Sequence, residues 1–147
     1  MPAKKLEHFT IWTVALESSV RFYVDLLGLV VGPRPDAPIP GAWLYNNSDT
    51  PIVHLVDVAN KTSKGMLKGS GRDVASLRGS GAIDHIAFEA DDIEDVRSKL
   101  SAKRYSFRQA EVPSMSLRQI FVLDPNGVQV ELNFHEAPSL DGAYKTP

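Results

Sequence analysis

The sequence predicts an α+β fold in which two βαβββ modules follow one another along a chain of 147 residues. The order of strand-like and helix-like segments in the first half returns in the second half. Two pairs of polar residues also recur at one offset of 77 residues, His8 with His85 and His54 with Glu131. A fixed offset indicates a duplicated unit. Because each half is too small to bury a good core alone, we expect both to fold as a single domain, residues 1–147.

The first module is predicted over residues 6–58. Alternating apolar and polar side chains at its start are typical of a strand and place His8 on the polar face. Apolar residues at helical spacing follow, and Gly28 supplies the C-terminal stop of that helix. The expected order is strand, helix and three strands, at residues 6–14, 16–27, 29–32, 42–46 and 52–58.

The second module is predicted over residues 82–134 and repeats this order. After a first strand that carries His85, Asp91 and Asp92 open a helix whose apolar positions recur at helical spacing. The four strands are expected at residues 83–90, 105–112, 117–123 and 128–134. The tail, residues 135–147, is rich in small and polar residues, and we expect it to be loose.

The segment between the modules, residues 59–81, differs in composition from both of them. Its glycines alternate with five lysine and arginine residues against the single acid Asp73, and we expect it to lack regular structure. Two interpretations stay open for this segment. It is either a solvated linker or a mobile basic lid over an anionic substrate.

Composition excludes several classes of function. The net charge of −2 comes without a basic stripe, so we expect no nucleic-acid partner. There is no cysteine, so a metal site must use nitrogen and oxygen ligands. No apolar run is long enough for a membrane span or a signal peptide, and we expect a cytoplasmic protein with no membrane partner.

The repeated polar residues are candidate metal ligands. Strand parity places each of them on the face opposite the apolar side chains of its own segment. A lone histidine in a strand is more often a hydrogen-bonded structural residue than a ligand. The joint pattern nevertheless favours one divalent metal ion, Zn, Ni, Mn or Fe(II), bound by His8, His54, His85 and Glu131.

The same parity argument selects candidate substrate-binding residues. Large aromatic side chains share the polar faces with the candidate ligands, although a cavity aromatic is more often packing than recognition. The candidates are the aromatic residues Trp12, Trp43, Tyr45 and Phe121, together with Gln119.

At these residues the chain resembles the vicinal oxygen chelate superfamily, which includes glyoxalase I, extradiol dioxygenases and bleomycin-resistance proteins. The resemblance spans Leu6 to Phe134, and its motifs are Leu6-Glu7-His8, the helix sequence at 19–29, Ile83-Asp84-His85-Ile86-Ala87-Phe88 and residues 124–131. It implies a curved mixed sheet around a central metal cavity with His8, His85 and Glu131 as ligands. His54 stands where glyoxalase I has a carboxylate ligand. A homodimer is also implied.

Residues 34–36, 41–45 and 52–55 resemble a glyoxalase-I-like subgroup more closely. This resemblance implies a lyase or isomerase that acts on a small substrate with two adjacent oxygens, with Glu131 as the catalytic proton carrier. An extradiol ring-cleaving dioxygenase is one alternative, because two histidines and a carboxylate are typical of non-haem Fe(II) oxygenases. A metal-free, resistance-type binding protein is the other. The ligand pattern disfavours this last alternative.

Overall fold

The structure of the protein is a computed structural model that describes residues 3–136. It divides into two compact units. The first contains the chain up to Ser80 together with Asp124–Val128, and the second contains Gly81–Leu123 and the chain from Gln129 onward. Each unit holds one four-stranded mixed sheet, which confirms the predicted α+β fold of two βαβββ modules. The predicted tail lies, beyond Glu136, outside the described residues.

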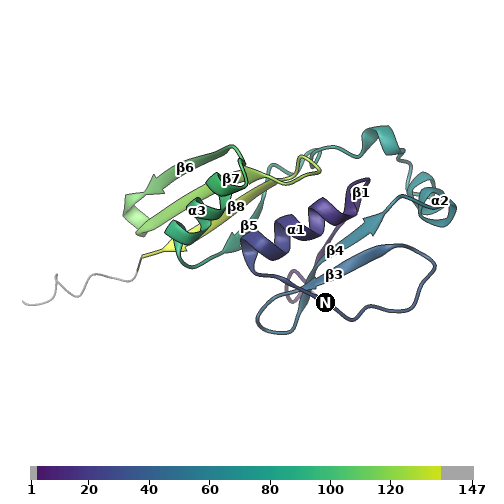
Figure 1. The fold of residues 1–147 in the computed structure, drawn as a ribbon, viewed down its shortest axis with the longest axis horizontal. Helices are drawn as coiled ribbons and strands as arrows, with labels where there is room; N and C mark the ends of the chain where they lie inside the picture. Colours follow the sequence, from purple (N-terminus) through teal and green to yellow (C-terminus); the bar gives the residue numbers. More distant parts are fainter. Residues whose placement is uncertain (1–2, 137–147) are drawn as a thin grey trace, which may run out of the picture. The chain divides into compact units, whose positions relative to one another are not determined.

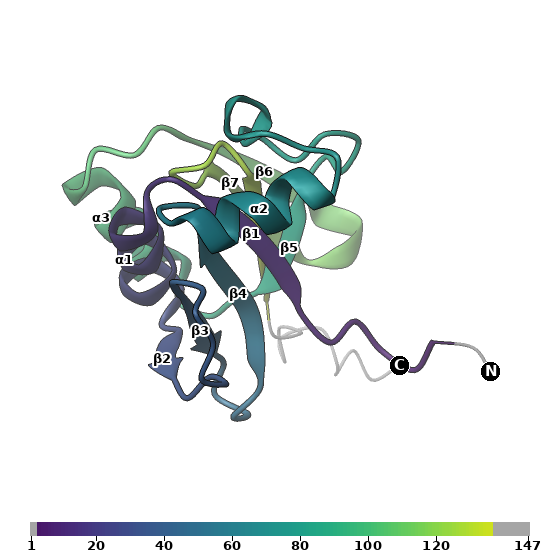
Figure 2. The same ribbon diagram turned by 90° about the vertical axis from the view of Figure 1, so that its right-hand side faces the viewer.

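The first unit contains one helix and one open sheet. In chain order its elements are β1 (Phe9–Thr13), α1 (Leu16–Leu27), β2 (Val30–Gly32), β3 (Gly41–Tyr45) and β4 (Pro51–Asp57). The strand order in the sheet is β1-β4-β3-β2, with β1 parallel to β4 and the other pairs antiparallel. Helix α1 packs against β3 and β4 (Figures 1 and 2).

Helix α1 has the bounds that its periodicity predicts. It ends where Gly28 adopts a left-handed conformation, with φ of 68°, and the Gly28 amide donates to the carbonyls of Tyr23 and Val24. Its buried face consists of Ser19, Phe22, Tyr23 and Leu26. This face covers the apolar side of the sheet, so His54 and Trp43 are left on the opposite side.

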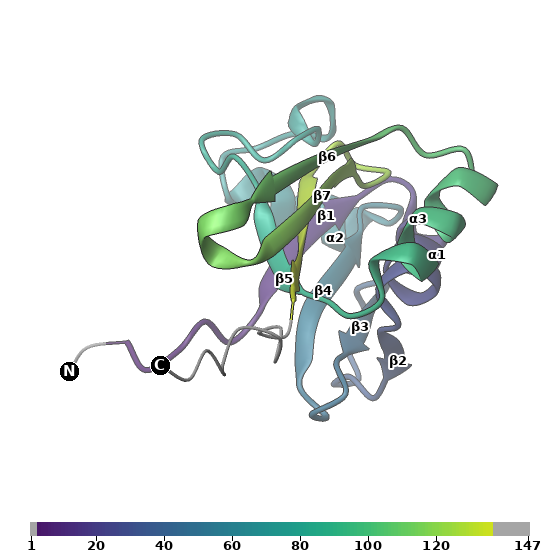
Figure 3. The same cartoon turned by 90° about the vertical axis from the view of Figure 1, so that its left-hand side faces the viewer.

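The second unit repeats the topology of the first. Its elements are β5 (Ile86–Glu89), α3 (Ile93–Ala102), β6 (Phe107–Val112), β7 (Leu117–Leu123) and β8 (Gln129–His135). The strand order is β5-β8-β7-β6, and β5 is parallel to β8. Strands β5, β6 and β7 of this unit are labelled in Figure 3. Ile93, Val96 and Leu100 form the buried face of α3.

Strand β5 is shorter than predicted. Its pairing with β8 begins only at Ile86, which lies opposite Val130, so His85 precedes the strand instead of lying within it. A turn that contains Gly81, with φ of 62°, comes just before. His8 holds the same place in the first unit, one residue ahead of β1.

The expectation that residues 59–81 lack regular structure was wrong. This segment forms the helix α2 (Lys61–Gly69) and a 3₁₀ turn at Val74–Ser76. The side chain of Asn60 caps α2 by accepting from the amide of Ser63, and Ser63 and Leu67 are buried one helical turn apart. No helix among the described residues is long and apolar enough to cross a membrane.

A buried polar network joins the turn between β7 and β8 to the first unit. Oδ1 of Asp124 accepts from the amides of Asn126 and Val128, and Oδ2 accepts from the Tyr23 hydroxyl and the Asn126 side chain. Asn126 in turn accepts from the Thr13 hydroxyl and donates to Ser19. Every one of these groups is buried and hydrogen-bonded, so the network fixes the turn as part of the first unit.

Candidate metal centre

His54 lies at the middle of a stack of three aromatic rings in the first unit. It belongs to β4, where its register partners are Thr10 on β1 and Trp43 on β3. The Trp43 ring stacks on it with centroids 4.0 Å apart and planes at 4°, and the His8 ring stacks on it at 4.0 Å and 17°. Both histidines are candidate ligands of one predicted four-ligand site, and the structure brings their rings into contact.

The imidazole of His54 carries a nitrogen without a partner. Among the described residues, no hydrogen-bonding group reaches its buried Nε2 atom, and the residue is only 9% exposed. The pKa of His54 is lowered by burial first and by the neighbouring His8 second, against smaller opposing effects of the Pro51 backbone and Glu7. A buried neutral imidazole with a free lone pair is the form in which histidine binds metal ions.

His85 and Glu131, the candidate ligands of the second module, also lie close together. Nε2 of His85 lies 3.1 Å from Oε2 of Glu131, and Glu131 is 7% exposed. Neighbouring ligands of one octahedral ion with bonds of about 2.1 Å are separated by about 3.0 Å. The spacing of these two atoms therefore fits two ligands of the same cation.

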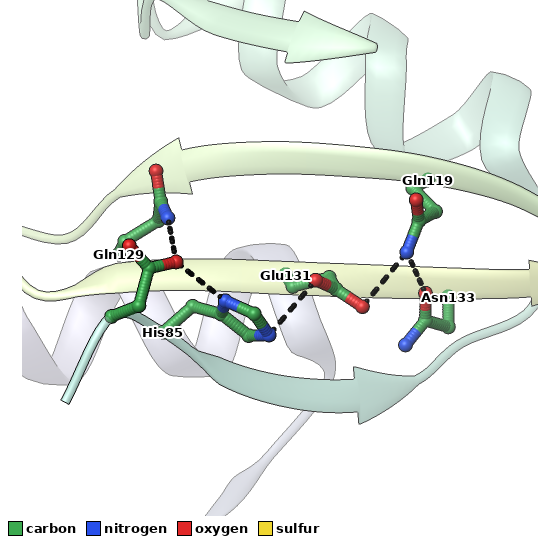
Figure 4. A network of polar contacts seen from close by, with 6 residues as sticks. His85, Gln119, Gln129, Glu131 and Asn133 are labelled. Carbon is green, nitrogen blue, oxygen red and sulfur yellow. Dashed lines mark hydrogen bonds and ion pairs between the residues drawn. The ribbon is translucent and has the colours of Figure 1, made fainter. Parts of the chain in front are cut away.

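A chain of hydrogen bonds holds this pair from both ends (Figure 4). The side-chain amide of Gln119 donates to Oε1 of Glu131 at 2.9 Å and to Oδ1 of Asn133 at 3.0 Å. On the other side, Oδ2 of Asp84 lies 2.7 Å from Nδ1 of His85 and accepts from Gln129 at 3.1 Å. Oε1 is thus engaged by Gln119, and Oε2 is the oxygen that faces His85.

The four candidate ligands consequently form two pairs, one in each unit. His8 and His54 belong to the first unit, and His85 and Glu131 belong to the second. Within the part of the chain that the structure describes, no group of three or more histidine, aspartate or glutamate residues is close enough to hold a metal ion. The donors in each pair nevertheless fit a divalent ion, because the buried Nε2 of His54 has no partner among the described residues and Nε2 of His85 faces a carboxylate oxygen at 3.1 Å.

The candidate substrate residues have different surroundings. Trp43 is stacked on His54, whereas the Tyr45 hydroxyl donates to the carbonyl of Pro33 at 2.6 Å. Trp12 is partly buried in β1, opposite Val56. Gln119 holds Glu131, as described above. Phe121 presents an edge contact to His85, with centroids 6.2 Å apart.

Two further side chains near His85 were not expected from the sequence. Arg108 places its guanidinium 3.9 Å from the centroid of the Phe121 ring, in the register row that also contains Glu131. Asp84 contacts His85 directly. The sequence contained a signal for Asp84, because Glu7 stands before His8 as Asp84 stands before His85. It contained no comparable signal for Arg108.

Comparison with solved structures supports the fold. A lactoylglutathione lyase from Agrobacterium tumefaciens matches with a TM-score of 0.60 at 18% identity, over 91% of this chain and 96% of that one. The trypanothione-dependent glyoxalase I of Leishmania major matches with a TM-score of 0.62 at 21% identity, over 88% and 86%. A glyoxalase/bleomycin resistance protein/dioxygenase from Nocardioides matches with a TM-score of 0.62 at 22% identity, over 100% and 91%.

At these identities the structural likeness shows a common fold and does not fix a reaction. A search of curated proteins found no match. A sequence model of the Glyoxalase/Bleomycin resistance protein/Dioxygenase superfamily, however, matches residues 5–132, which is nearly the whole chain. With two βαβββ modules, each carrying one half of the expected ligand set, the chain belongs to this superfamily.

Proposed function

We propose that this protein is a metal-dependent lyase or isomerase of the glyoxalase I type, acting on a small substrate with two adjacent oxygens. Its proposed ligands are His8, His54, His85 and Glu131. Superfamily members are often enzymes and generally use a divalent metal ion. The observation that carries the proposal for this chain is the buried, partnerless Nε2 of His54. An orphaned buried nitrogen costs stability, and a bound cation would remove that cost.

The bound ion would polarise two adjacent substrate oxygens and stabilise negative charge on them. The rest of the chemistry belongs to the side chains. Glu131 would accept a substrate proton and return it, while Gln119 holds its Oε1 atom in place. The proposed substrate contacts are Trp12, Trp43, Tyr45, Gln119 and Phe121. Of these, Trp43, Gln119 and Phe121 touch candidate ligands directly.

The dioxygenase alternative rests on His54 as well. If the stack with His8 and Trp43 is its permanent position, His54 is a packed aromatic residue and the ligand set is reduced to two histidines and one carboxylate. That set is typical of non-haem Fe(II) oxygenases and leaves room for a second small molecule. We favour the four-ligand site, because a purely structural role for His54 does not explain why its buried Nε2 atom lacks a partner among the described residues.

Elemental analysis of protein purified without chelator tests the metal. We expect one divalent ion per chain, lost in His85→Ala and Glu131→Ala. His135→Ala is the control, because His135 is exposed at the end of β8 and has no proposed role. Full metal content in Glu131→Ala contradicts the ligand assignment. Isomerisation of 2-oxoaldehyde thiol adducts without cleavage of catechols supports the lyase or isomerase, and the reverse result supports the dioxygenase.

The proposed assembly is a homodimer. Each sheet ends in strands with one paired neighbour, β1 and β2 in the first unit and β5 and β6 in the second. Open strand edges favour association, and symmetric dimers are the commonest oligomers. Light scattering at micromolar concentration should give twice the chain mass of 16.1 kDa. A monomer alone in that measurement contradicts the assembly.

A further inference from the structure

A carboxylate stands immediately before each of the two histidines that lead a strand. Glu7 precedes His8 and Asp84 precedes His85, so the offset of 77 residues extends to these acids. In both units the carboxylate contacts the same ring nitrogen: Oε2 of Glu7 lies 3.5 Å from Nδ1 of His8, and Oδ2 of Asp84 lies 2.7 Å from Nδ1 of His85. We infer that Asp84, and more weakly Glu7, are positioning residues that select Nε2 of the adjacent histidine as the metal-binding atom.

This inference rests on the proposed metal site, and its chemistry follows from the imidazole ring. A neutral imidazole carries one N–H and one lone pair. If Nδ1 donates its hydrogen to a carboxylate, Nε2 presents the lone pair. Carboxylate partners of ligating histidines fix the tautomer and the ring orientation, and they raise the basicity of the ligand.

At His85 two carboxylates compete for that single hydrogen. Asp84 is 2.7 Å from Nδ1, and Glu131 is 3.1 Å from Nε2. Donation to Glu131 would place a hydrogen on Nε2 and block the lone pair that a cation needs. The shorter contact favours donation to Asp84, which keeps Nε2 and Oε2 of Glu131 both available as donors of electron pairs.

Asp84 is itself held in place by a side chain of the neighbouring strand. Its Oδ2 atom accepts from Gln129, which lies two residues before Glu131 on β8 and therefore on the same face. The side chain of Asp84 is 82% exposed, so its replacement leaves the packed core intact. An effect of that replacement on metal binding would accordingly come through His85.

The contact between the carboxylate and Nδ1 of the next histidine is shorter in the second unit than in the first. A distance of 2.7 Å is that of a charge-assisted hydrogen bond, whereas 3.5 Å is beyond the usual range. We therefore expect the loss of Asp84 to weaken the site more than the loss of Glu7.

The first experiment measures Zn(II) affinity by competition with a chelator. Asp84→Ala should weaken binding about 10-fold or more, and Glu7→Ala should weaken it less. Asp36→Ala, which removes one exposed carboxylate from the loop between β2 and β3, should leave affinity unchanged. Asp84→Glu should recover part of the loss. Affinity in Asp84→Ala equal to that of the unmodified protein overturns the inference.

The second experiment reads the tautomer directly and needs no metal. In metal-free protein with ¹⁵N-labelled histidine, under conditions in which the ring is neutral, we expect His85 to carry its hydrogen on Nδ1. Asp84→Ala should move that hydrogen to Nε2, toward Glu131. An Nε2–H tautomer in the unmodified protein overturns the inference even if metal binds. If no metal binds but the tautomer changes as expected, the proposed function fails and the positioning role of Asp84 stands.

Discussion

The Tyr23 hydroxyl donates a hydrogen bond of 3.0 Å to Oδ2 of Asp124, which lies 101 residues further along the chain. Both residues are buried, and both belong to the first unit. Tyr23→Phe removes this bond and leaves Asp124 with its three other donors, so we expect a loss of about 1 kcal/mol in the free energy of unfolding. Urea denaturation at neutral pH measures it. Tyr45→Phe, whose hydroxyl bond is exposed, should cost less.

The same contact predicts a loss of stability in alkali. Burial, and then the charge and hydrogen bond of Asp124, raise the pKa of Tyr23 well above its ordinary value of 10.0. The unfolded chain therefore ionises at this position before the folded chain does. The contribution of Tyr23 is complete below pH 10 and falls by up to about 1.4 kcal/mol per pH unit above it. Denaturation at pH 9 to 11 should show a steeper fall in the unmodified protein than in Tyr23→Phe, and equal slopes contradict this assignment.

Replacement of His54 by phenylalanine should have opposite effects on stability and on metal binding. Phenylalanine preserves the aromatic stack with Trp43 and His8 and removes the orphaned buried Nε2. Unfolding of the metal-free protein should then require the same free energy or up to about 1 kcal/mol more, because an unsatisfied buried nitrogen is lost. Metal affinity should fall about 10-fold or more. His135→Phe, at an exposed site, is the control for both measurements.

Two glycines should respond to alanine in opposite directions. A Cβ atom on Gly41 would lie 2.1 Å from the backbone oxygen of Leu55, within the pairing of β3 and β4, so Gly41→Ala should cost about 1–3 kcal/mol. Gly65 lies inside α2 with nothing within 4 Å of a new Cβ, and Gly65→Ala should add about 0.5–1 kcal/mol. Thermal unfolding of both variants distinguishes the signs. A stabilised Gly41→Ala contradicts the described approach of β3 to β4.

Helix α2 should depend on its one buried apolar side chain, Leu67. Leu67 is 1% exposed, and Leu67→Ala should lower stability by about 2–5 kcal/mol or detach the helix locally. Trypsin should then cut faster after Lys64 and Lys68. Met66→Ala changes the adjacent residue, which is 49% exposed, and should leave cleavage as it is. Rapid cleavage of the unmodified protein at these lysines would instead support a mobile segment.

Local patterns predicted the modules well. The bounds of α1 follow from its apolar spacing and from Gly28, and β7 has the predicted bounds of Leu117–Leu123. Helix α2 was missed because Gly65 and Gly69 suggest a flexible chain, whereas the helix is stabilised by the burial of Leu67. Local composition does not predict such burial, because it depends on the tertiary structure.

In the candidate site, too, the sequence predicted which residues are involved but not how their side chains are oriented. Parity and the repeat predicted that His8, His54, His85 and Glu131 share one metal site. Within the units, the structure brings His8 against His54 and His85 against Glu131. Neither pattern carries the orientation of a side chain. The engagement of Gln119 with Glu131, the stacking of Trp43 and the orphaned nitrogen of His54 depend on rotamers that the packed neighbours select.

The network around Asn126 sets an order of events during synthesis. Thr13 and Asn126 are separated by 113 positions, so β1 and α1 leave the ribosome long before their buried partner has been translated. Until then the hydroxyls of Thr13 and Ser19 and the phenol of Tyr23 lack the turn that satisfies them. The amino-terminal part of the first unit therefore completes this network only after the turn that contains Asp124 and Asn126 has left the ribosome.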